Sequence, residues 1–248
     1  MLLTDALVLH AFDYRETSRI VRLATREAGV VSAVARGARR PKNRFGSGLD
    51  LFTSGVAHLA LHPTGDLHTL HAFDAGRPRP GLGDSLARFR AASALGELGL
   101  RVGPEDPGGA VFTALGAGLD AIAVAGDVDV AAATLAAAWR LVGAVGVAPT
   151  LLQCAACDRP LEAEEAVRFA PRAGGALCRP CAALAPGARL LPAAARAALV
   201  AWAQGEGVAL DEAPTRRAHL RLLREFVEEH LAERTPLRAW RAWETEVG

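Results

Sequence analysis

Four cysteines are the residues best suited to chemistry in this 248-residue chain. Cys154 and Cys157 form one pair with two residues between them, and Cys178 and Cys181 form a second such pair after twenty intervening residues. Two residues between ligands let a tight turn direct both thiolates at one point, and two such turns complete a tetrahedral Zn²⁺ site. All four ligands then come from the protein, so the pattern predicts one structural zinc ion per chain.

Other uses of the cysteines stay open at this point: two disulfides, an iron site, or a site that has lost its metal. The chain opens without a recognisable signal peptide, so we expect a cytoplasmic protein, in which thiols stay reduced and metal binding is favoured over disulfides. A zinc deaminase site is excluded, because it needs a proline directly before the first cysteine of a pair and a His-x-Glu partner. Gln153 and Leu177 stand at the two positions where a proline would be required.

The second chemical feature is a cluster of positive charge that we call the cation loop. It contains five cations and no acid: Arg36, Arg39, Arg40, Lys42 and Arg44. Two glycines and a proline interrupt the run, which excludes a regular helix. The formal net charge of the whole chain is only +1, and like charges repel, so the folded monomer gains nothing from the cluster. Phosphates would relieve the repulsion, so we expect the loop to bind a nucleic-acid backbone.

Further cations are predicted to extend this positive surface along the preceding strand, namely Arg19, Arg22 and Arg26. Leu49, Leu51 and Phe52 are expected to anchor the end of the loop on the fold. Aromatic residues make up only 5% of the chain, and Tyr14, Phe45 and Phe52 are the candidates for base stacking in this region. We therefore expect binding to phosphates to dominate over stacking.

The first eighty residues predict a small β-barrel, at residues 1–79. Three short aliphatic runs, Ala6–Phe12, Arg19–Thr25 and Val30–Arg36, are separated by turn residues. Val56–Phe73 alternates on both sides of a turn at Thr64-Gly65, which places Leu59 opposite Leu70. One face of this hairpin is expected to hold Ala57, Leu59, Leu61, Leu70 and Ala72. Five strands in this length fit an OB-type or an SH3-like barrel.

The remainder, residues 80–248, predicts a helical bundle with a zinc-ribbon-like insertion at about residues 150–184, so the whole chain is α+β. Helices are expected at Pro192–Gln204 and Thr215–Glu233. The predicted buried stripes are Ala91, Ala94, Leu95 and Leu98; Val111, Leu115, Leu119 and Ile122; Leu135, Trp139, Val142 and Gly146; and Leu220, Leu223, Val227 and Leu231. Two Ala- and Gly-rich stretches resemble membrane spans, but Asp120 and Arg140 interrupt them, so we expect no membrane insertion.

The sequence offers no evidence of an enzyme. It lacks a phosphate-binding loop ending in GK[ST], and no nucleophile is paired with a base. His58 and His62 lie four residues apart on a predicted strand, roughly 13 Å by strand rise, which is too far to share a metal ion. These observations favour a binding protein.

In their order along the chain, these segments resemble the RecO family of bacterial recombination and DNA-repair mediators. The resemblance rests on a small N-terminal barrel, the stretch RGARRPKNRFGSGLDLF, the CAAC…GGALCRPC insertion and the closing LRLLREFVEEHL helix. It implies an OB fold, binding of single- and double-stranded DNA, and annealing of complementary strands. It also implies a nucleoid-associated cytoplasmic protein that works with RecR and the single-stranded-DNA-binding protein to load RecA onto coated DNA.

The resemblance further implies a site for the acidic, apolar tail of the single-stranded-DNA-binding protein on the helical bundle. We expect an apolar groove there, with a rim formed by Arg196, Arg216, Arg217 and Arg221. The alternative hypothesis is a zinc-ribbon adaptor that binds another protein through its helices and does not contact DNA. Salt-dependent binding to unrelated DNA sequences distinguishes the two.

Overall fold

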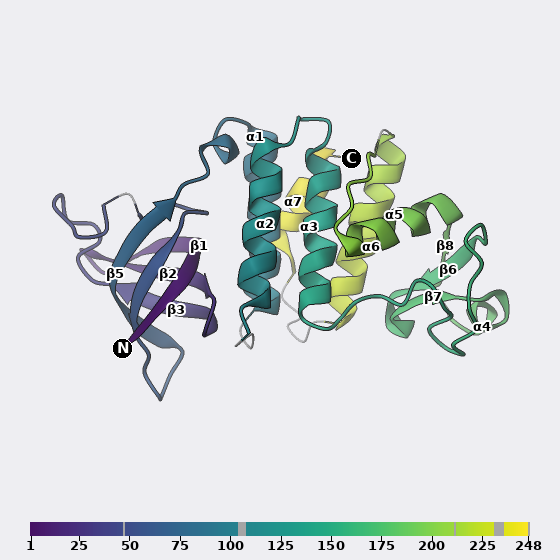
Figure 1. Cartoon of the computed structure of the whole chain (residues 1–248), viewed down its shortest axis with the longest axis horizontal. Coiled ribbons are helices and arrows are strands. Elements are labelled where there is room, and N and C mark those ends of the chain that lie inside the picture. Colours follow the sequence, from purple (N-terminus) through teal and green to yellow (C-terminus); the bar gives the residue numbers. More distant parts are fainter. Residues whose placement is uncertain (47, 104–107, 211, 231–235, 248) are drawn as a thin grey trace.

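A β-barrel, a layer of helices and a small cysteine-containing module follow one another along the long axis of the molecule (Figure 1). This computed structural model describes residues 1–46, 48–103, 108–210, 212–230 and 236–247. The predicted order of barrel, helical body and cysteine insertion is confirmed, and so is the α+β class.

The barrel consists of five strands: β1 (Leu2–Tyr14), β2 (Ser18–Thr25), β3 (Gly29–Ala35), β4 (Ser54–Ala60) and β5 (Leu67–Arg77). They close in the order β1-β2-β3-β5-β4, with β3 and β5 parallel and the other pairs antiparallel. β1 can close the barrel because its first half pairs with β4 and its second half with β2, with an irregularity between Val8 and His10. Of the two barrels that the sequence allowed, the fold is the OB type.

The hairpin of β4 and β5 departs from the predicted pattern at a bulge. Leu59 pairs with Leu70 as predicted, and both side chains are fully buried. The next pair is His58 with Ala72, so β5 carries one extra residue at this point. The bulge turns Phe73 into the barrel in place of Ala72, which was predicted to lie inside. Leu61 was also predicted to be buried, but it follows the end of β4 and is 43% exposed.

The helical body is formed by α1 (Leu86–Val102), α2 (Ala110–Val124), α3 (Val130–Ala144), α5 (Ala193–Gln204), α6 (Ala213–His230) and α7 (Arg238–Val247), after a short 3-10 turn, η1 (Pro80–Leu82). The predicted stripes on α1, α2, α3 and α6 are buried, with two exceptions. Gly146 lies beyond the end of α3 with φ +78°, and Leu231 lies outside the described residues. No described helix has the length and apolar character needed to cross a membrane.

Helix α7 was missed in the sequence analysis. Trp240 and Trp243 lie three residues apart on it, and both are buried with their rings edge to face at 5.2 Å. Glu97 of α1 accepts hydrogen bonds from the backbone N–H groups of Arg238 and Trp240 at the start of α7. The helix therefore closes the bundle by packing against α1.

The cysteine module lies between α3 and α5. It contains β6 (Val167–Ala170), a 3-10 turn η2 (Pro171–Ala173), β7 (Gly175–Leu177), the short helix α4 (Arg179–Ala183) and β8 (Arg189–Leu191). The three strands form a sheet in the order β7-β6-β8. The predicted hairpin between the two cysteine pairs is confirmed as β6 and β7.

A buried arginine joins the barrel to the helical body. Only 5% of the Arg79 side chain is exposed. Its guanidinium donates to the Asp120 carboxylate of α2 at 2.8 Å, to the Phe52 carbonyl at 2.6 Å and to the Ser54 hydroxyl at 2.8 Å. Asp120 also pairs at 3.1 Å with Arg77, whose side chain is 69% exposed. The Asp120 carboxylate thus pairs with two arginines, the buried Arg79 and the exposed Arg77.

We expect Arg79→Ala to lower the free energy of unfolding by about 2–4 kcal/mol, because it leaves the buried Phe52 carbonyl without its donor and Asp120 with only the exposed Arg77. Arg77→Ala is the matched control, and a change below about 0.5 kcal/mol is expected because exposed ion pairs contribute little. Urea unfolding measures both. Equal destabilisation in the two variants would show that Arg79 does not hold the junction.

Candidate nucleic-acid interface and metal centre

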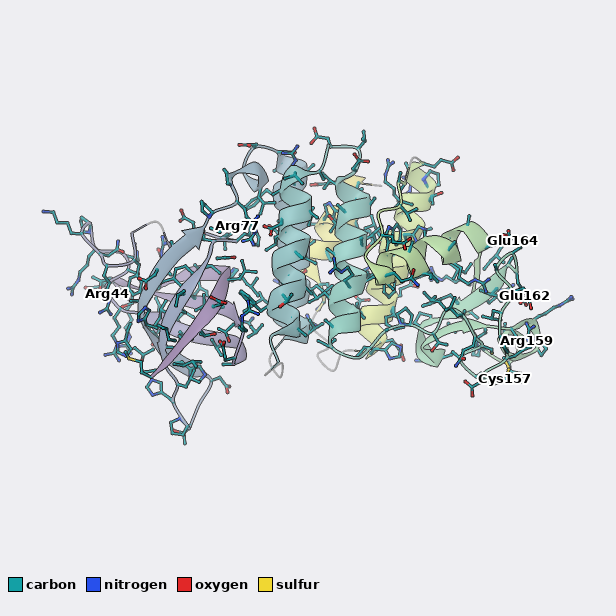
Figure 2. The ribbon with its side chains drawn as sticks, in the orientation of Figure 1. Arg44, Arg77, Cys157, Arg159, Glu162 and Glu164 are labelled. Atoms are coloured by element: carbon teal, nitrogen blue, oxygen red, sulfur yellow. The ribbon has the colours of Figure 1, made fainter. Side chains whose placement is uncertain are left out.

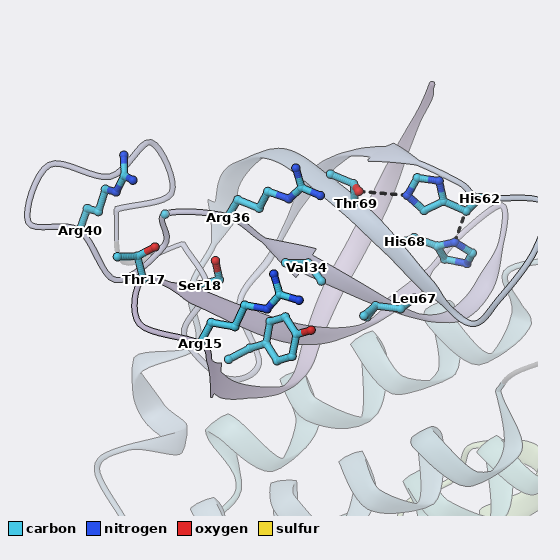
Figure 3. A pocket seen from close by; sticks show the side chains of 12 residues that line it. Arg15, Thr17, Ser18, Val34, Arg36, Arg40, His62, Leu67, His68 and Thr69 are labelled. Atoms are coloured by element: carbon cyan, nitrogen blue, oxygen red, sulfur yellow. Dashed lines mark hydrogen bonds between the residues drawn. The ribbon is translucent and has the colours of Figure 1, made fainter.

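A cleft of about 470 Å³ opens at the end of the barrel where three connections meet (Figure 3). Four residues each come from the β1–β2 turn with its flanking strand ends, from the end of β3 with the segment after it, and from the β4–β5 loop with the start of β5. The lining residues are Tyr14, Arg15, Thr17 and Ser18; Val34, Arg36, Gly37 and Arg40; and His62, Leu67, His68 and Thr69. In OB barrels the β1–β2 and β4–β5 connections are the ones that bind oligonucleotides.

The cation loop borders this cleft. All five of its cations are exposed, and Arg36 and Arg40 line the cleft itself. Arg39 differs from the prediction of an unpaired cluster, because it forms an ion pair with Asp13 at 3.3 Å and donates to the Glu16 carbonyl at 3.2 Å. Among the described residues, the other four cations form no ion pair with an acid. Figure 2 shows Arg44 at the outer end of the barrel.

The end of the cation loop is anchored in the protein interior. Phe45 and Leu49 are 4% exposed and pack in the barrel core, while Phe52 is 3% exposed and packs among the helices. The Asn43 side chain accepts from the Phe45 N–H at 2.8 Å and donates to the Arg40 carbonyl at 3.0 Å. Leu51 does not share this anchoring role, since it is 39% exposed. Phe45 and Phe52 cannot act as stacking platforms for bases as predicted, because both rings are buried.

The three arginines predicted to extend the positive surface do not lie together. Arg19 lies beside the cation loop, opposite Ala35, and pairs with Asp13 at 3.4 Å. Arg22 lies in the middle of β2 and is half-buried. Arg26 follows the other end of β2, where it pairs with Asp5 at 3.0 Å and lies over the Phe112 ring at 4.9 Å. None of the three lines the cleft, although Arg22 lies opposite Ser32, which pairs with the cleft residue Leu67.

Three residues of the cleft were missed in the sequence analysis. Arg15 occupies the β1–β2 turn with φ +53°, a conformation that residues other than glycine rarely adopt. His62 lies in the β4–β5 loop and was considered in the sequence analysis only as a possible metal ligand, and His68 lies at the start of β5. The signal that could have found them is topological, because the first and fourth turns of an OB barrel lie at its binding surface.

The four cysteines come together at the far end of the molecule from the cation loop (Figure 2). All four sulfur atoms lie within 4.8 Å of one another, and none is bonded to another. The Cys157 and Cys178 sulfurs are 3.8 Å apart. A tetrahedral site with Zn–S bonds of about 2.3 Å has S···S separations of about 3.8 Å, so the donor set and its spacing fit such an ion.

Backbone geometry directs the thiols inward. The Cys154 N–H donates to the Arg159 carbonyl at 2.8 Å, and the Asp158 N–H donates to the Cys154 carbonyl at 2.9 Å, which closes the first turn. Burial opposes ionisation of Cys154, but N–H groups that include that of Cys178 outweigh it and lower the pKa of this thiol to about 6. The neighbouring Cys178 thiol raises the pKa of Cys181 to about 12. A divalent metal ion would remove this conflict by stabilising all four thiolates.

Arg196 connects this module to the helices and does not lie at the surface. It is 4% exposed and donates to the carbonyl oxygens of Glu162 and Ala163, the second at 2.9 Å. Its predicted place on an exposed rim is therefore wrong, because the side chain is enclosed by the module that it supports.

The other predicted rim residues do not form one rim. Arg216 donates to the Leu210 carbonyl at 3.1 Å, whereas Arg217 lines a hollow that it shares with Arg221, Arg224 and Arg241. Arg221 alone borders an apolar groove of about 390 Å³ between β8 and α6. The helix periodicity placed these residues on α5 and α6 but did not show which face each would occupy.

The apolar groove, as we call it, has one cationic end and an unusual floor. Arg189 and Arg221 both pair with Glu225, at 2.9 Å and 2.8 Å. His219 in the lining is 2% exposed, and its Nδ1 has no partner among the described residues. Burial lowers the pKa of this imidazole to about 4, so it is neutral at physiological pH. The groove thus offers an apolar surface with a few fixed polar groups.

Comparison with known proteins adds an independent result. The family models described as "Recombination protein O N terminal" and "Recombination protein O C terminal" match residues 1–78 and 84–240. The DNA repair protein RecO of Anaeromyxobacter sp. (strain Fw109-5) is 38% identical over 240 residues, which cover 94% of this chain and 92% of that protein. The one from Rubrobacter xylanophilus is 34% identical over 180 residues, 73% of this chain and 71% of that protein.

We expect Cys154→Ser to reduce the metal content from one ion per chain toward zero, because one missing thiolate opens the coordination shell. Local folding energy disappears with the metal, so residues 153–182 should become sensitive to proteases. Arg172→Ala is the matched control in the same module, since it removes only an exposed ion pair with Glu229, and it should retain the metal. Elemental analysis of freshly reduced protein measures the content, and a metal-free wild type would contradict the prediction.

Proposed function

The chain belongs to the RecO family of DNA repair proteins, and from this premise we propose that it is a recombination mediator. It binds single- and double-stranded DNA through the barrel and anneals complementary strands. The observation that carries this proposal is the group of four cations, unpaired among the described residues, beside a cleft formed by the two binding turns of an OB barrel. As a mediator it brings strands and partners together and does not itself catalyse a reaction.

Binding at this surface should be largely independent of sequence. Arginine and lysine side chains on a loop bind phosphates, which carry no base information. Binding to DNA would also use the exposed positive charge of the cation loop, which a zinc-ribbon adaptor without DNA contact would not need. The protein would act at the nucleoid in the cytoplasm.

The proposal includes two protein partners. We infer that RecR binds the chain, and that together they help load RecA onto DNA coated by the single-stranded-DNA-binding protein. The acidic, apolar tail of that coating protein would enter the apolar groove between β8 and α6. Support comes from the apolar lining and from Arg189 and Arg221, which are placed to meet acidic side chains.

Zinc is the metal we propose for the four thiols. Soft thiolate ligands in a closed tetrahedral arrangement favour Zn²⁺, which would hold the module together without a catalytic role. DNA binding should not need the ion directly, because the cysteines and the cation loop lie at opposite ends of the molecule (Figure 2).

The DNA-binding proposal is tested by replacing Arg36, Arg40, Lys42 and Arg44 together with alanine. For each phosphate on a single strand that the protein no longer neutralises, the slope of log K against log salt changes by roughly 0.7, so three such phosphates flatten it by about 2 units. Affinity should fall equally for unrelated DNA sequences. Binding titrations at several salt concentrations measure both quantities.

The matched control for this variant is Arg101→Ala together with Arg140→Ala, two cations of the helical body outside the cleft. This pair should keep the wild-type slope. If instead the four-fold variant retains wild-type affinity and slope, DNA does not bind at the cation loop, and the adaptor hypothesis gains support.

For the partner groove, we expect Arg189→Glu together with Arg221→Glu to weaken binding of a synthetic acidic tail peptide at least tenfold. Charge reversal there repels the acidic side chains and leaves Glu225 without its partners. Arg217→Glu is the control, since this residue of α6 does not line the apolar groove, although it shares a neighbouring hollow with Arg221. Isothermal titration measures the affinities, and an equal reduction in the control would place the peptide elsewhere.

A further inference from the structure

We infer that the barrel cleft is a pocket for one unstacked base, so that it distinguishes single-stranded DNA from duplex DNA. The cation loop would then bind the phosphates of both forms, and the cleft would add affinity for single strands alone. This inference rests on the proposed DNA-binding function and names the part of the ligand that the cleft accepts.

The first observation is a stacking platform at one wall of the cleft. Tyr14 is half-buried at the end of β1, and the Arg15 guanidinium lies over its ring at 5.1 Å from the centroid. Bases stack on aromatic rings and on guanidinium planes alike. Both residues line the cleft, so the pair presents such a plane to it, and Figure 3 shows the Arg15 side chain there.

The backbone of Arg15 supports the same conclusion. Its φ of +53° is unfavourable for a residue with a Cβ atom. Glycine would suit this turn better, so the arginine brings a side chain to the cleft at some cost in backbone strain. Strained residues of this kind gather at binding sites.

The floor and the opposite wall have the mixed character that a base requires. Val34 and Leu67 lie at the floor, between Arg15 and the histidines (Figure 3). The His62 Nε2 lies 3.0 Å from the Thr69 hydroxyl, and the backbone N–H of His62 donates to His68 Nδ1 at 3.1 Å. These bonds fix both imidazoles beside the cleft. An apolar floor covers a base, and the polar wall can meet the hydrogen-bonding groups at its edge.

The mouth of the cleft explains why the occupant is a nucleotide within a strand. Arg36 and Arg40 line the same cleft and belong to the cation loop, so a phosphate attached to the bound base meets them. The volume of about 470 Å³ falls within the range of small-molecule pockets, roughly 300–1,000 Å³. A base within a duplex stays stacked and paired, so it cannot reach the floor.

The decisive experiment compares Tyr14→Leu with its matched control Tyr14→Phe, which keeps the ring. Three probes are used: a single-stranded oligonucleotide, the same strand with abasic sites, and a duplex. Tyr14→Leu should bind the normal single strand at least about fivefold more weakly and retain wild-type affinity for the duplex. Tyr14→Phe should retain both, and neither variant should change the salt slope.

The abasic strand completes a double-mutant cycle. Wild-type protein should bind more weakly when the bases are removed, whereas Tyr14→Leu should weaken little further, because the partner of the missing base is already absent. Arg15→Gly is a second variant that the backbone tolerates, and it should show the same insensitivity to abasic sites.

The inference is overturned if Tyr14→Leu and Arg15→Gly both discriminate normal from abasic strands as wild type does. It is also overturned if Tyr14→Leu weakens binding to single strands and duplex equally. In either case the proposed DNA binding stands as long as the cation-loop variant flattens the salt slope. If the cation-loop variant also keeps the wild-type DNA affinity and salt slope, the proposed function fails independently.

Discussion

The placement of the cation loop depends on the buried guanidinium of Arg79. It joins the carbonyl of Phe52, where the cation loop ends, to Asp120 on α2. The Phe52 ring enters the helical core, where a Cβ on Gly96 would approach it to 3.1 Å, so no larger residue fits there without a shift. The loop can carry exposed, mutually repelling cations because its end is fixed by this contact and by the buried rings of Phe45 and Phe52.

The elongated shape separates two kinds of charge arrangement. At the barrel end, four cations have no acidic partner among the described residues and remain available to phosphates. At the other end, Arg196 is enclosed and directed at carbonyl groups of the cysteine module, while Arg189 and Arg221 share Glu225. Charge that is paired inside the protein stabilises structure, and charge in excess of its internal partners is what an external anion can use. Arg189 and Arg221 together exceed Glu225 by one positive charge.

Local patterns were predictable from the sequence, and tertiary placement was not. The cysteine spacing predicted the four-thiol cluster because two-residue turns act within a few residues, and strand alternation predicted the barrel. The bulge beside Ala72 placed the β5 residues that follow it on the opposite face from the one predicted, because one extra residue shifts the alternation of inward and outward side chains by one position. Arg196 and Arg221 were grouped by charge, although helix packing sends one inside and the other to a groove. Arg15 and His62 line the same cleft only because the barrel closes.

The burial of most aromatic rings bears on how the proposed annealing can work. A protein that stacks many bases holds a strand tightly but keeps those bases from pairing with a complement. Here Phe45 and Phe52 are inside the fold, and among the described residues that line the cleft Tyr14 supplies the single phenyl-type ring. Phosphate neutralisation by the cation loop would reduce the repulsion between two strands, and a single base pocket would leave the remaining bases free to pair. A small stacking surface beside a large cationic one therefore suits a protein that must release its strands into a duplex.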